Sequence, residues 1–393
     1  MGREEVLVSL TQALVRAQSY SGEEQKVADI LAEFFNQNGF DKVQTDVYGN
    51  MIGSVYGNRP GPAVLFDGHM DTVPVPDASV WKHNPFGGEI EDGKLYGRGA
   101  SDMMGALAAM ACAAAAFTKD NGRDFAGSIH IAGVVHEECF EGVAARSISG
   151  LIHPDVVVIG EASELNLQIG QRGRAEIKVE TYGKSAHSAN PEKGVNAVYQ
   201  MCKLISRIRA IEPPVCERLG KGILELTDIL SSPYPGASVV PDRCVATFDR
   251  RLLTGETKES VLEPVAACIR ALAAEDETFS AKAYFSVGEE MCYTDEKIVG
   301  ERFFPGWLAE PDAEYVVKIK ARLDELGVNP AITQYNFCTN GSHYAGEAGI
   351  RTIGFGPSRE NLAHTVEEYI ELTQLSKAML GYTGIMEALL AGK

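Results

Sequence analysis

The sequence has no paired cysteine motif, no excess of basic residues and no long apolar run, and each absence excludes a class of protein. Its eight cysteines are scattered without a CxxC pair, which predicts reduced core thiols and excludes a disulfide framework or a thiolate zinc site. The formal net charge of −18 argues against nucleic acid or an anionic membrane as partner, because both attract a basic face. No apolar run approaches membrane-spanning length, and the N-terminus lacks an apolar signal core. We therefore expect a cytoplasmic protein.

The 393 residues are 45% hydrophobic, which predicts a globular chain of two domains. An apolar run over 63–66 predicts a buried strand that ends near Gly68, so His69 and Asp71 lie where the strand becomes a loop. Residues i and i+2 of an extended segment point to the same side. The pair therefore suits a metal ligand and a carboxylate that orients it. For this pair alone, an ordinary hydrogen bond within a loop is the alternative.

More acidic residues follow the next predicted strands. Asp102 precedes the small-residue helix 105–117 and could instead cap that helix. Glu137 and Glu138 follow one apolar strand and Glu161 follows the next, although acids in loops are often only solvated. Because ligands of open α/β sheets bind at the carboxyl ends of the strands, acids repeated strand after strand predict a site.

The pattern changes near residue 173. Residues 173–288 have the βαββαβ order of a ferredoxin-like sandwich, with enough apolar positions for a core of their own. The sequence thus predicts an α/β protein, in which a mixed-sheet α/β/α domain in two parts, 1–172 and 289–393, surrounds an inserted ferredoxin-like α+β domain at 173–288. Two local predictions concern helix ends. Ser21 and Glu24 form a capping box for the second helix, and the final helix begins at Glu367.

Five motifs, spread over almost the whole chain, resemble those of the M20 family of metallopeptidases and amidohydrolases. They are Gly68-His69-Met70-Asp71-Thr72-Val73-Pro74, Gly97-Arg98-Gly99-Ala100-Ser101-Asp102, Glu137-Glu138, Gly160-Glu161-Ala162-Ser163 and Ala363-His364-Thr365-Val366-Glu367. The family includes aminoacylases, acetylornithine and succinyl-diaminopimelate deacylases, carboxypeptidases and dipeptidases. The segment 340–344 also resembles a hydrolase subgroup associated with selenium metabolism.

The resemblance implies a centre with two divalent metal ions. The ligands it implies are His69, Asp102 and Glu161 for one ion, and Asp102, Glu138 and His364 for the other. Asp102 would bridge the two ions, Asp71 would orient His69, and the Asp102–Met103 peptide bond would be cis. Imidazole and carboxylate ligands without thiolates suit Zn²⁺, with Co²⁺ and Mn²⁺ as alternatives.

The resemblance also implies the chemistry. Metal-bound water would attack the amide bond of a small N-acyl amino acid or a short peptide, with Glu137 as general base. A dipeptidase and an N-carbamoyl amino acid amidohydrolase are alternatives within the same fold. A non-catalytic metal-binding assembly protein is a third reading, but a protein that only binds metal needs no spare base such as Glu137.

Further residues are implied to contact substrate or to complete the site. His187 would stabilise the oxyanion, and in dimeric members it enters the partner's active site. Arg251 would bind a substrate carboxylate, with an exposed strand ion pair as the alternative. Asn196 either contacts substrate or caps its helix. We expect a small-molecule substrate with a free carboxylate, and a homodimer formed through an inserted domain that also serves as a lid.

The glycine-rich loop near residue 340 departs from the family pattern. Gly341 and Ser342 are expected near the substrate, but His343 stands where many members have aspartate. His343 is therefore either a polar substrate contact or a structural loop residue, and the substrate of no family member can be transferred to this chain.

Overall fold

The computed structural model describes residues 2–391, and the chain forms two compact units. Unit 1 contains the described residues up to Gln171, the segment Glu289–Gly300 and the described residues from Leu308 onward. Unit 2 contains Arg172–Gly288 and Glu301–Trp307. The predicted insert lacks this last segment, whose strand β17 (Phe303–Phe304) pairs with the start of β9 (Gly173–Tyr182).

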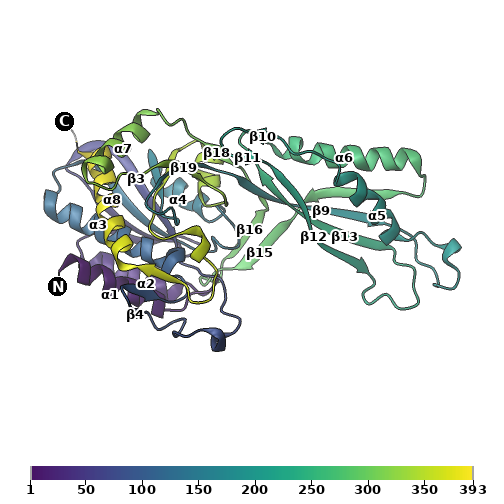
Figure 1. Cartoon of the computed structure of the whole chain (residues 1–393), viewed down its shortest axis with the longest axis horizontal. Helices are drawn as coiled ribbons and strands as arrows, with labels where there is room; N and C mark the ends of the chain where they lie inside the picture. The colour runs from purple at the N-terminus through teal and green to yellow at the C-terminus, as the bar shows by residue number, and fades with distance from the viewer. Residues whose placement is uncertain (1, 392–393) are drawn as a thin grey trace. The chain divides into compact units, whose positions relative to one another are not determined.

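Unit 1 is built on a mixed sheet, which confirms the predicted α/β class (Figure 1). In sheet order its strands are β1 (Lys42–Thr45), β2 (Met51–Tyr56), β6 (Ala126–Val134), β3 (Arg59–His69), β7 (Val156–Ile159), β20 (Arg351–Gly354), β8 (Leu167–Gln171) and β18 (Trp307–Leu308), with β19 (Ile332–Tyr335) paired to β8. The central strands β6, β3, β7 and β20 run parallel, whereas β1, β2 and β8 pair in antiparallel fashion.

The central strands are continuous apolar runs because both faces of the sheet are covered. Every residue of β7 is buried, as are the last six residues of β3 and of β6. The register places His69 beside Val134 and Asp67 beside Ile159. The carboxyl ends of β6, β3 and β7 therefore meet at one edge.

The helices of unit 1 pack on this sheet and on one another. They are α1 (Arg3–Arg16), α2 (Gln25–Gln37), α3 (Gly105–Asn121), α4 (Ala145–Ile152), α7 (Glu314–Glu325) and α8 (Leu372–Leu390). The alanine-rich α3 contacts α8 and the strands β3 and β6. It approaches β3 so closely that a Cβ atom on Gly68 would lie 2.8 Å from Met110 Cε.

The length and hydropathy of segment Ala100–Asn121 would allow it to cross a membrane, although the sequence was expected to contain no such run. In the fold, 83% of its most apolar window is buried. The segment is a core helix of unit 1, as its packing on the sheet requires.

Two predicted helix ends are wrong for the same reason, which is that long-range contacts replace local ones. Helix α2 has no capping box, because the Ser21 hydroxyl donates to Asp71 Oδ2 at 2.7 Å. The final helix begins at Leu372 instead of Glu367. The residues before it form β21 (Tyr369–Glu371), which pairs with β5 (Lys94–Tyr96) in a small sheet completed by β4 (Glu89–Glu91).

Unit 2 has the element order βαββαβ. Its elements are β9, α5 (Ala197–Ile208), β12 (Ile223–Ser232), β13 (Arg243–Leu252), α6 (Lys258–Glu275) and β14 (Ser280–Phe285), besides the small hairpin of β10 (Val215–Cys216) and β11 (Gly220–Lys221). The sheet order β12-β13-β9-β14 is that of a ferredoxin-like sandwich. Alternate residues of β13, including Ala246 and Phe248, are buried in the core that α5 and α6 complete.

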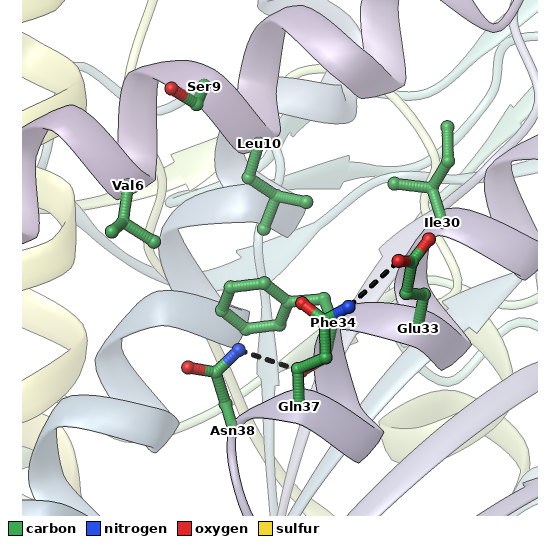
Figure 2. Close-up of a pocket in the computed structure, with 8 residues that line it drawn as sticks. All are labelled: Val6, Ser9, Leu10, Ile30, Glu33, Phe34, Gln37 and Asn38. Atoms are coloured by element: carbon green, nitrogen blue, oxygen red, sulfur yellow. Dashed lines mark hydrogen bonds between the residues drawn. The ribbon is translucent and has the colours of Figure 1, made fainter. Parts of the chain in front are cut away.

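A surface hollow of about 410 Å³ lies between α1 and α2 (Figure 2). Phe34 lies in it, and hydrogen bonds within α2 hold Gln37 and Asn38 at its border. Its lining residues are Val6, Ser9, Leu10, Ile30, Glu33, Phe34, Gln37 and Asn38. They include none of the residues expected to bind metal or substrate.

Candidate metal centre

Three neighbouring parallel strands deliver four of the expected side chains to one edge of the large sheet. His69 is the last residue of β3. Glu137 and Glu138 follow the end of β6 at Val134, and Glu161 follows the end of β7 at Ile159. The adjacency of these strands explains why polar residues far apart in sequence meet there.

Asp102 and His364 reach the same place from loops. Asp102 lies in an irregular segment, Ala100–Met104, that precedes α3. The strand before it, β5, belongs to the small sheet and not to the large one, so Asp102 reaches the site through its loop. The Asp102–Met103 peptide bond is cis, as the family resemblance predicts. His364 lies in the loop before β21 with a left-handed backbone, at φ 62°.

The two histidines lie on either side of Asp102. His69 Nε2 is 2.8 Å from Asp102 Oδ1 and 3.6 Å from Glu161 Oε1. His364 Nε2 is 3.2 Å from Asp102 Oδ2 and 3.0 Å from Glu138 Oε1. Each carboxylate oxygen of Asp102 thus faces a different histidine, which is the arrangement that a bridging ligand needs.

Glu137 differs from its neighbours at this site. Its Oε1 atom is buried and accepts no hydrogen bond from the described residues 2–391. Ligand atoms of His69, Glu137 and Glu161 lie within 4.8 Å of one another, and so do those of His69, Asp102 and Glu138. By distance alone, Glu137 is close enough to be either a ligand or a base.

Asp71 contacts both His69 and the loop that carries Glu137 and Glu138. His69 Nδ1 donates to the Asp71 carbonyl oxygen at 2.7 Å, and the carboxylate oxygen Oδ1 is farther away, at 3.5 Å. The main chain of Asp71 therefore orients the ring more directly than its carboxylate, and it leaves Nε2 facing the site. The carboxylate accepts the backbone N–H groups of Glu137 at 3.0 Å and Glu138 at 3.2 Å. Asp71 thus also holds the loop that carries both glutamates.

The acids at this site repel one another. Burial, and then the charge of Glu161, raises the pKa of Glu137 well above its usual range. Burial and Asp102 raise the pKa of Glu161 to about 8. Hydrogen bonds to Asp102 and Glu138 raise the pKa of His364 to about 10. The expected ligands and base carry more negative than positive charge, and divalent cations would neutralise the excess. The groups are two histidines, His69 and His364, and four buried or half-buried carboxylates, those of Asp102, Glu137, Glu138 and Glu161.

The donor set fits catalytic divalent cations. It contains imidazole nitrogens and carboxylate oxygens and no thiolate, as in open zinc, cobalt or manganese sites. The orphaned oxygen of Glu137 is the kind of buried polar atom that an ion or a metal-bound ligand would satisfy. On both counts the residues present suit a pair of ions.

The expected substrate residues of unit 2 have distinct local settings. His187 is exposed, and its Nδ1 accepts the backbone N–H of Ala189 at 3.0 Å. Arg251 Nε donates to Asp249 Oδ1 at 2.8 Å, and its side chain remains 31% exposed. Asn196 Oδ1 accepts the N–H of Val198 at 2.9 Å, which supports its capping alternative.

The glycine-rich loop is largely engaged in contacts within unit 1. His343 is buried, with Nε2 2.7 Å from Ser149 Oγ and Nδ1 2.9 Å from Glu347 Oε2. These contacts favour its structural alternative. Ser342 Oγ accepts from Gln171 Nε2 at 3.0 Å, and Gly341 lies in the same buried loop.

One buried residue beside the centre was not predicted. The carboxylate of Glu368 contacts the backbone of Asp102 and the side chain of Arg98. The signal that could have identified it is an acid pair, Glu367 and Glu368, directly before an apolar segment and close to His364.

Known proteins are similar to this chain in sequence and in fold. The sequence model of Peptidase family M20/M25/M40 matches residues 65–388. The protein YgeY of Escherichia coli K12, which is described as uncharacterized, is 33% identical over 90% of this chain and 87% of its own length. Succinyl-diaminopimelate desuccinylase 2 of Ruegeria sp. is 30% identical over 96% of this chain and 94% of its own. The crystal structure of aminopeptidase PepT from Bacillus cereus superposes with a TM-score of 0.76 at 21% identity, covering 99% of this chain and 100% of its own. The chain therefore belongs to peptidase family M20/M25/M40 and is a hydrolase that acts on amide bonds.

Proposed function

We propose that this protein hydrolyses the amide bond of a small N-acyl amino acid or a short peptide, using two divalent ions, with Zn²⁺ as the first choice. The observation that carries the proposal is the placement of Asp102 between two histidines. His69 and Glu161 would complete one ion site with Asp102, and His364 and Glu138 would complete the other. Ions held there would polarise the carbonyl group and lower the pKa of a water molecule.

Glu137 supplies the proton transfers. Its Oε1 atom is buried and has no hydrogen bond from the described residues, so it can accept a proton from water. The same carboxyl group then donates that proton to the leaving amine. Asp71 keeps Glu137 in place through the backbone N–H of the same residue.

The proposal also gives roles to two residues of unit 2. His187 stabilises the oxyanion and Arg251 binds the substrate carboxylate. The outer guanidinium nitrogens of Arg251 suit a carboxylate, since its ion pair with Asp249 uses Nε. Arg250 is less suited, because it is buried and bonded to Glu256.

The names of two relatives support an amide substrate. The Ruegeria protein is named a desuccinylase and the Bacillus cereus protein an aminopeptidase, so a deacylase and a peptidase share this fold. A dipeptidase or an N-carbamoyl amino acid amidohydrolase is the second candidate. Assaying N-acyl amino acids, dipeptides and N-carbamoyl amino acids with added Zn²⁺, Co²⁺ or Mn²⁺ tests the proposal. No turnover of any class by protein that has bound two ions would contradict it.

We also infer a homodimer formed through unit 2. The strand β12 is at the edge of its sheet, where unpaired backbone groups can pair with a second chain. Ile229 and Leu230 on this edge are 45% and 52% exposed. Light scattering should give twice the mass of one chain, and Leu230→Lys should lower that mass, whereas a monomeric wild type would exclude the dimer.

A further inference from the structure

Glu368 is fully buried next to the candidate centre without facing it. Its Oε1 atom accepts two consecutive backbone N–H groups, from Ser101 at 2.9 Å and Asp102 at 3.0 Å. Its Oε2 atom accepts from Arg98 Nη1 at 2.6 Å. We propose that Glu368 is a positioning residue that sets where Asp102 lies relative to His364, an inference that rests on the proposed function.

The segment held by Glu368 has an irregular backbone, and its other hydrogen bonds include those between the Ser101 and Ser358 hydroxyls and from Arg98 N–H to the Pro85 carbonyl oxygen. It follows the three-residue strand β5 and contains Gly97 and Gly99, both with positive φ. Asp102 itself has non-helical dihedral angles, φ −128° and ψ 90°. Regular helical hydrogen bonds begin only with α3, so the backbone N–H groups at 101 and 102 depend on the Glu368 carboxylate.

Glu368 also connects this segment to His364, four residues before it. Its own carbonyl oxygen accepts the N–H of Gly97 at 2.9 Å, so main chain and side chain of one residue grip the segment 97–102. Two positions that lie 266 residues apart are thereby held together. His364 and Asp102 lie on the two segments that Glu368 joins, and His364 Nε2 is 3.2 Å from Asp102 Oδ2.

The preceding residue, Glu367, anchors the same loop at a second point. Glu367 Oε2 lies 2.6 Å from His83 Nδ1, and Oε1 accepts the His83 backbone N–H at 3.1 Å. His364 is therefore carried by a loop anchored at two consecutive glutamates. Only the anchor at Glu368 reaches the backbone of a proposed metal ligand.

A buried carboxylate near Asp102 is costly unless it is paired, because the two charges repel. Arg98, whose side chain is 4% exposed, provides that pairing. Glutamine at position 368 would keep an acceptor for both N–H groups but lose the charge. Aspartate would keep the charge but shorten the side chain by one methylene group. The two substitutions separate position from charge.

The test measures metal affinity and not only turnover. Zn²⁺ or Co²⁺ is titrated in competition with a chelator into wild type, Glu368→Ala, Glu368→Gln and Glu368→Asp. We expect Glu368→Ala and Glu368→Asp to weaken one of the two ions by about 10–100-fold, the usual effect of losing a residue that supports a ligand. Glu368→Gln should lose clearly less metal affinity than these two variants. The Co²⁺ absorption spectrum should change only in the variants whose affinity falls.

Glu256→Gln is the matched control. It breaks another poorly exposed ion pair, between Arg250 and Glu256 in unit 2, whose side chains are 5% and 12% exposed. Its metal affinity should equal that of the wild type. If Glu368→Ala does not fold by circular dichroism, Glu368→Asp decides the question. A folded Glu368→Asp or Glu368→Ala protein with wild-type affinity for both ions overturns the positioning role. A wild type that binds fewer than two ions overturns the proposed centre itself, and this outcome is recognisable before any variant is made.

Discussion

The carboxylates of the adjacent residues Glu137 and Glu138 have different partners. Glu138 Oε1 lies 3.0 Å from His364 Nε2, whereas Glu137 Oε1 is buried without a hydrogen bond from the described residues. A ligand needs to face the other ligands, and a base needs a free oxygen. The difference supports the separate tasks that we propose for two residues whose sequence positions alone cannot distinguish them.

Glu137→Gln should abolish turnover and leave metal binding intact. The substitution keeps the size of the side chain but removes the base, and general bases contribute about 10²–10⁴-fold. Turnover and bound metal should be measured on the same preparation. The comparison variant is Glu138→Gln, which should lose affinity for one ion. Normal turnover of Glu137→Gln would contradict its role, and loss of metal would show that it is a ligand.

Asp71→Ala should weaken metal binding by about 10–100-fold and reduce turnover, because the backbone of Glu137 and Glu138 loses two hydrogen bonds to the carboxylate. The carbonyl oxygen of residue 71, which accepts from His69 Nδ1, remains. Ser21→Ala is the control, since it removes only one hydrogen bond to Asp71. It should cost about 1 kcal/mol of unfolding free energy and keep metal affinity. Chelator competition and urea unfolding measure the two effects. Equal metal affinities of Asp71→Ala and wild type would refute this prediction.

Metal affinity should rise with pH. In the metal-free protein the pKa of His364 is raised to about 10, mainly by its hydrogen bonds to Asp102 and Glu138, so its ring carries a proton at neutral pH. A binding ion must displace this proton, which calorimetry in buffers of different ionisation enthalpy would detect. His364→Gln has no proton to release, so its weaker binding should also depend less on pH. An equal number of released protons in both proteins would exclude His364 as a ligand.

Removing the metal should expose a second effect of His364. Because its pKa is higher in the folded than in the unfolded chain, its contribution to stability is full below about pH 6.5. That contribution is lost as the pH rises through about 10. Metal-free wild type should therefore lose unfolding free energy over this range relative to His364→Gln.

His83 should stabilise the protein in a pH-dependent way. Its hydrogen bond to Glu367, and then that to Glu91, raises its pKa, and its ring stacks on Tyr96 at a centroid distance of 3.9 Å. A raised histidine pKa stabilises the fold fully below about pH 6.5, and the effect disappears as the pH rises through the folded value. The stability difference between wild type and His83→Gln should thus be larger at about pH 6 than at about pH 9. A stability difference that grows with pH would contradict a stabilising role for the ion pairs of His83 with Glu367 and Glu91.

His343→Gln should reduce stability more than catalysis. Both ring nitrogens have partners, Ser149 and Glu347, and the residue is buried. We expect a loss of about 1–2 kcal/mol in urea unfolding with nearly unchanged kcat and KM. A large rise in KM without a loss of stability would instead support a substrate contact.

Buried parallel strands could be predicted well from the sequence, because covered sheets require continuous apolar runs. The apolar strand predicted before Glu161 is β7, Val156–Ile159, and the polar residues at the ends of β3, β6 and β7 meet as expected. The ferredoxin-like order of unit 2 could also be predicted, because its strands and helices alternate with clear periods.

What the sequence could not show depends on contacts between distant segments. The Ser21 hydroxyl matches a helix cap locally, but it bonds to Asp71, 50 residues away. Glu367 and Glu368 resemble the first turn of a helix, yet they anchor two loops. Local propensity contains no information on such partners, so the start of α8 and the role of Glu368 were missed.

The place of β20 in the large sheet has a consequence for biosynthesis. This strand, Arg351–Gly354, lies between β7 and β8, which precede it by more than 175 positions in the chain. A ribosome therefore exposes an incomplete sheet until the codons of β20 are translated, and His364 emerges later still. Nonsense mutations between the codons of β8 and β20 should for this reason leave a nascent protein without a finished sheet, which cellular proteases would degrade.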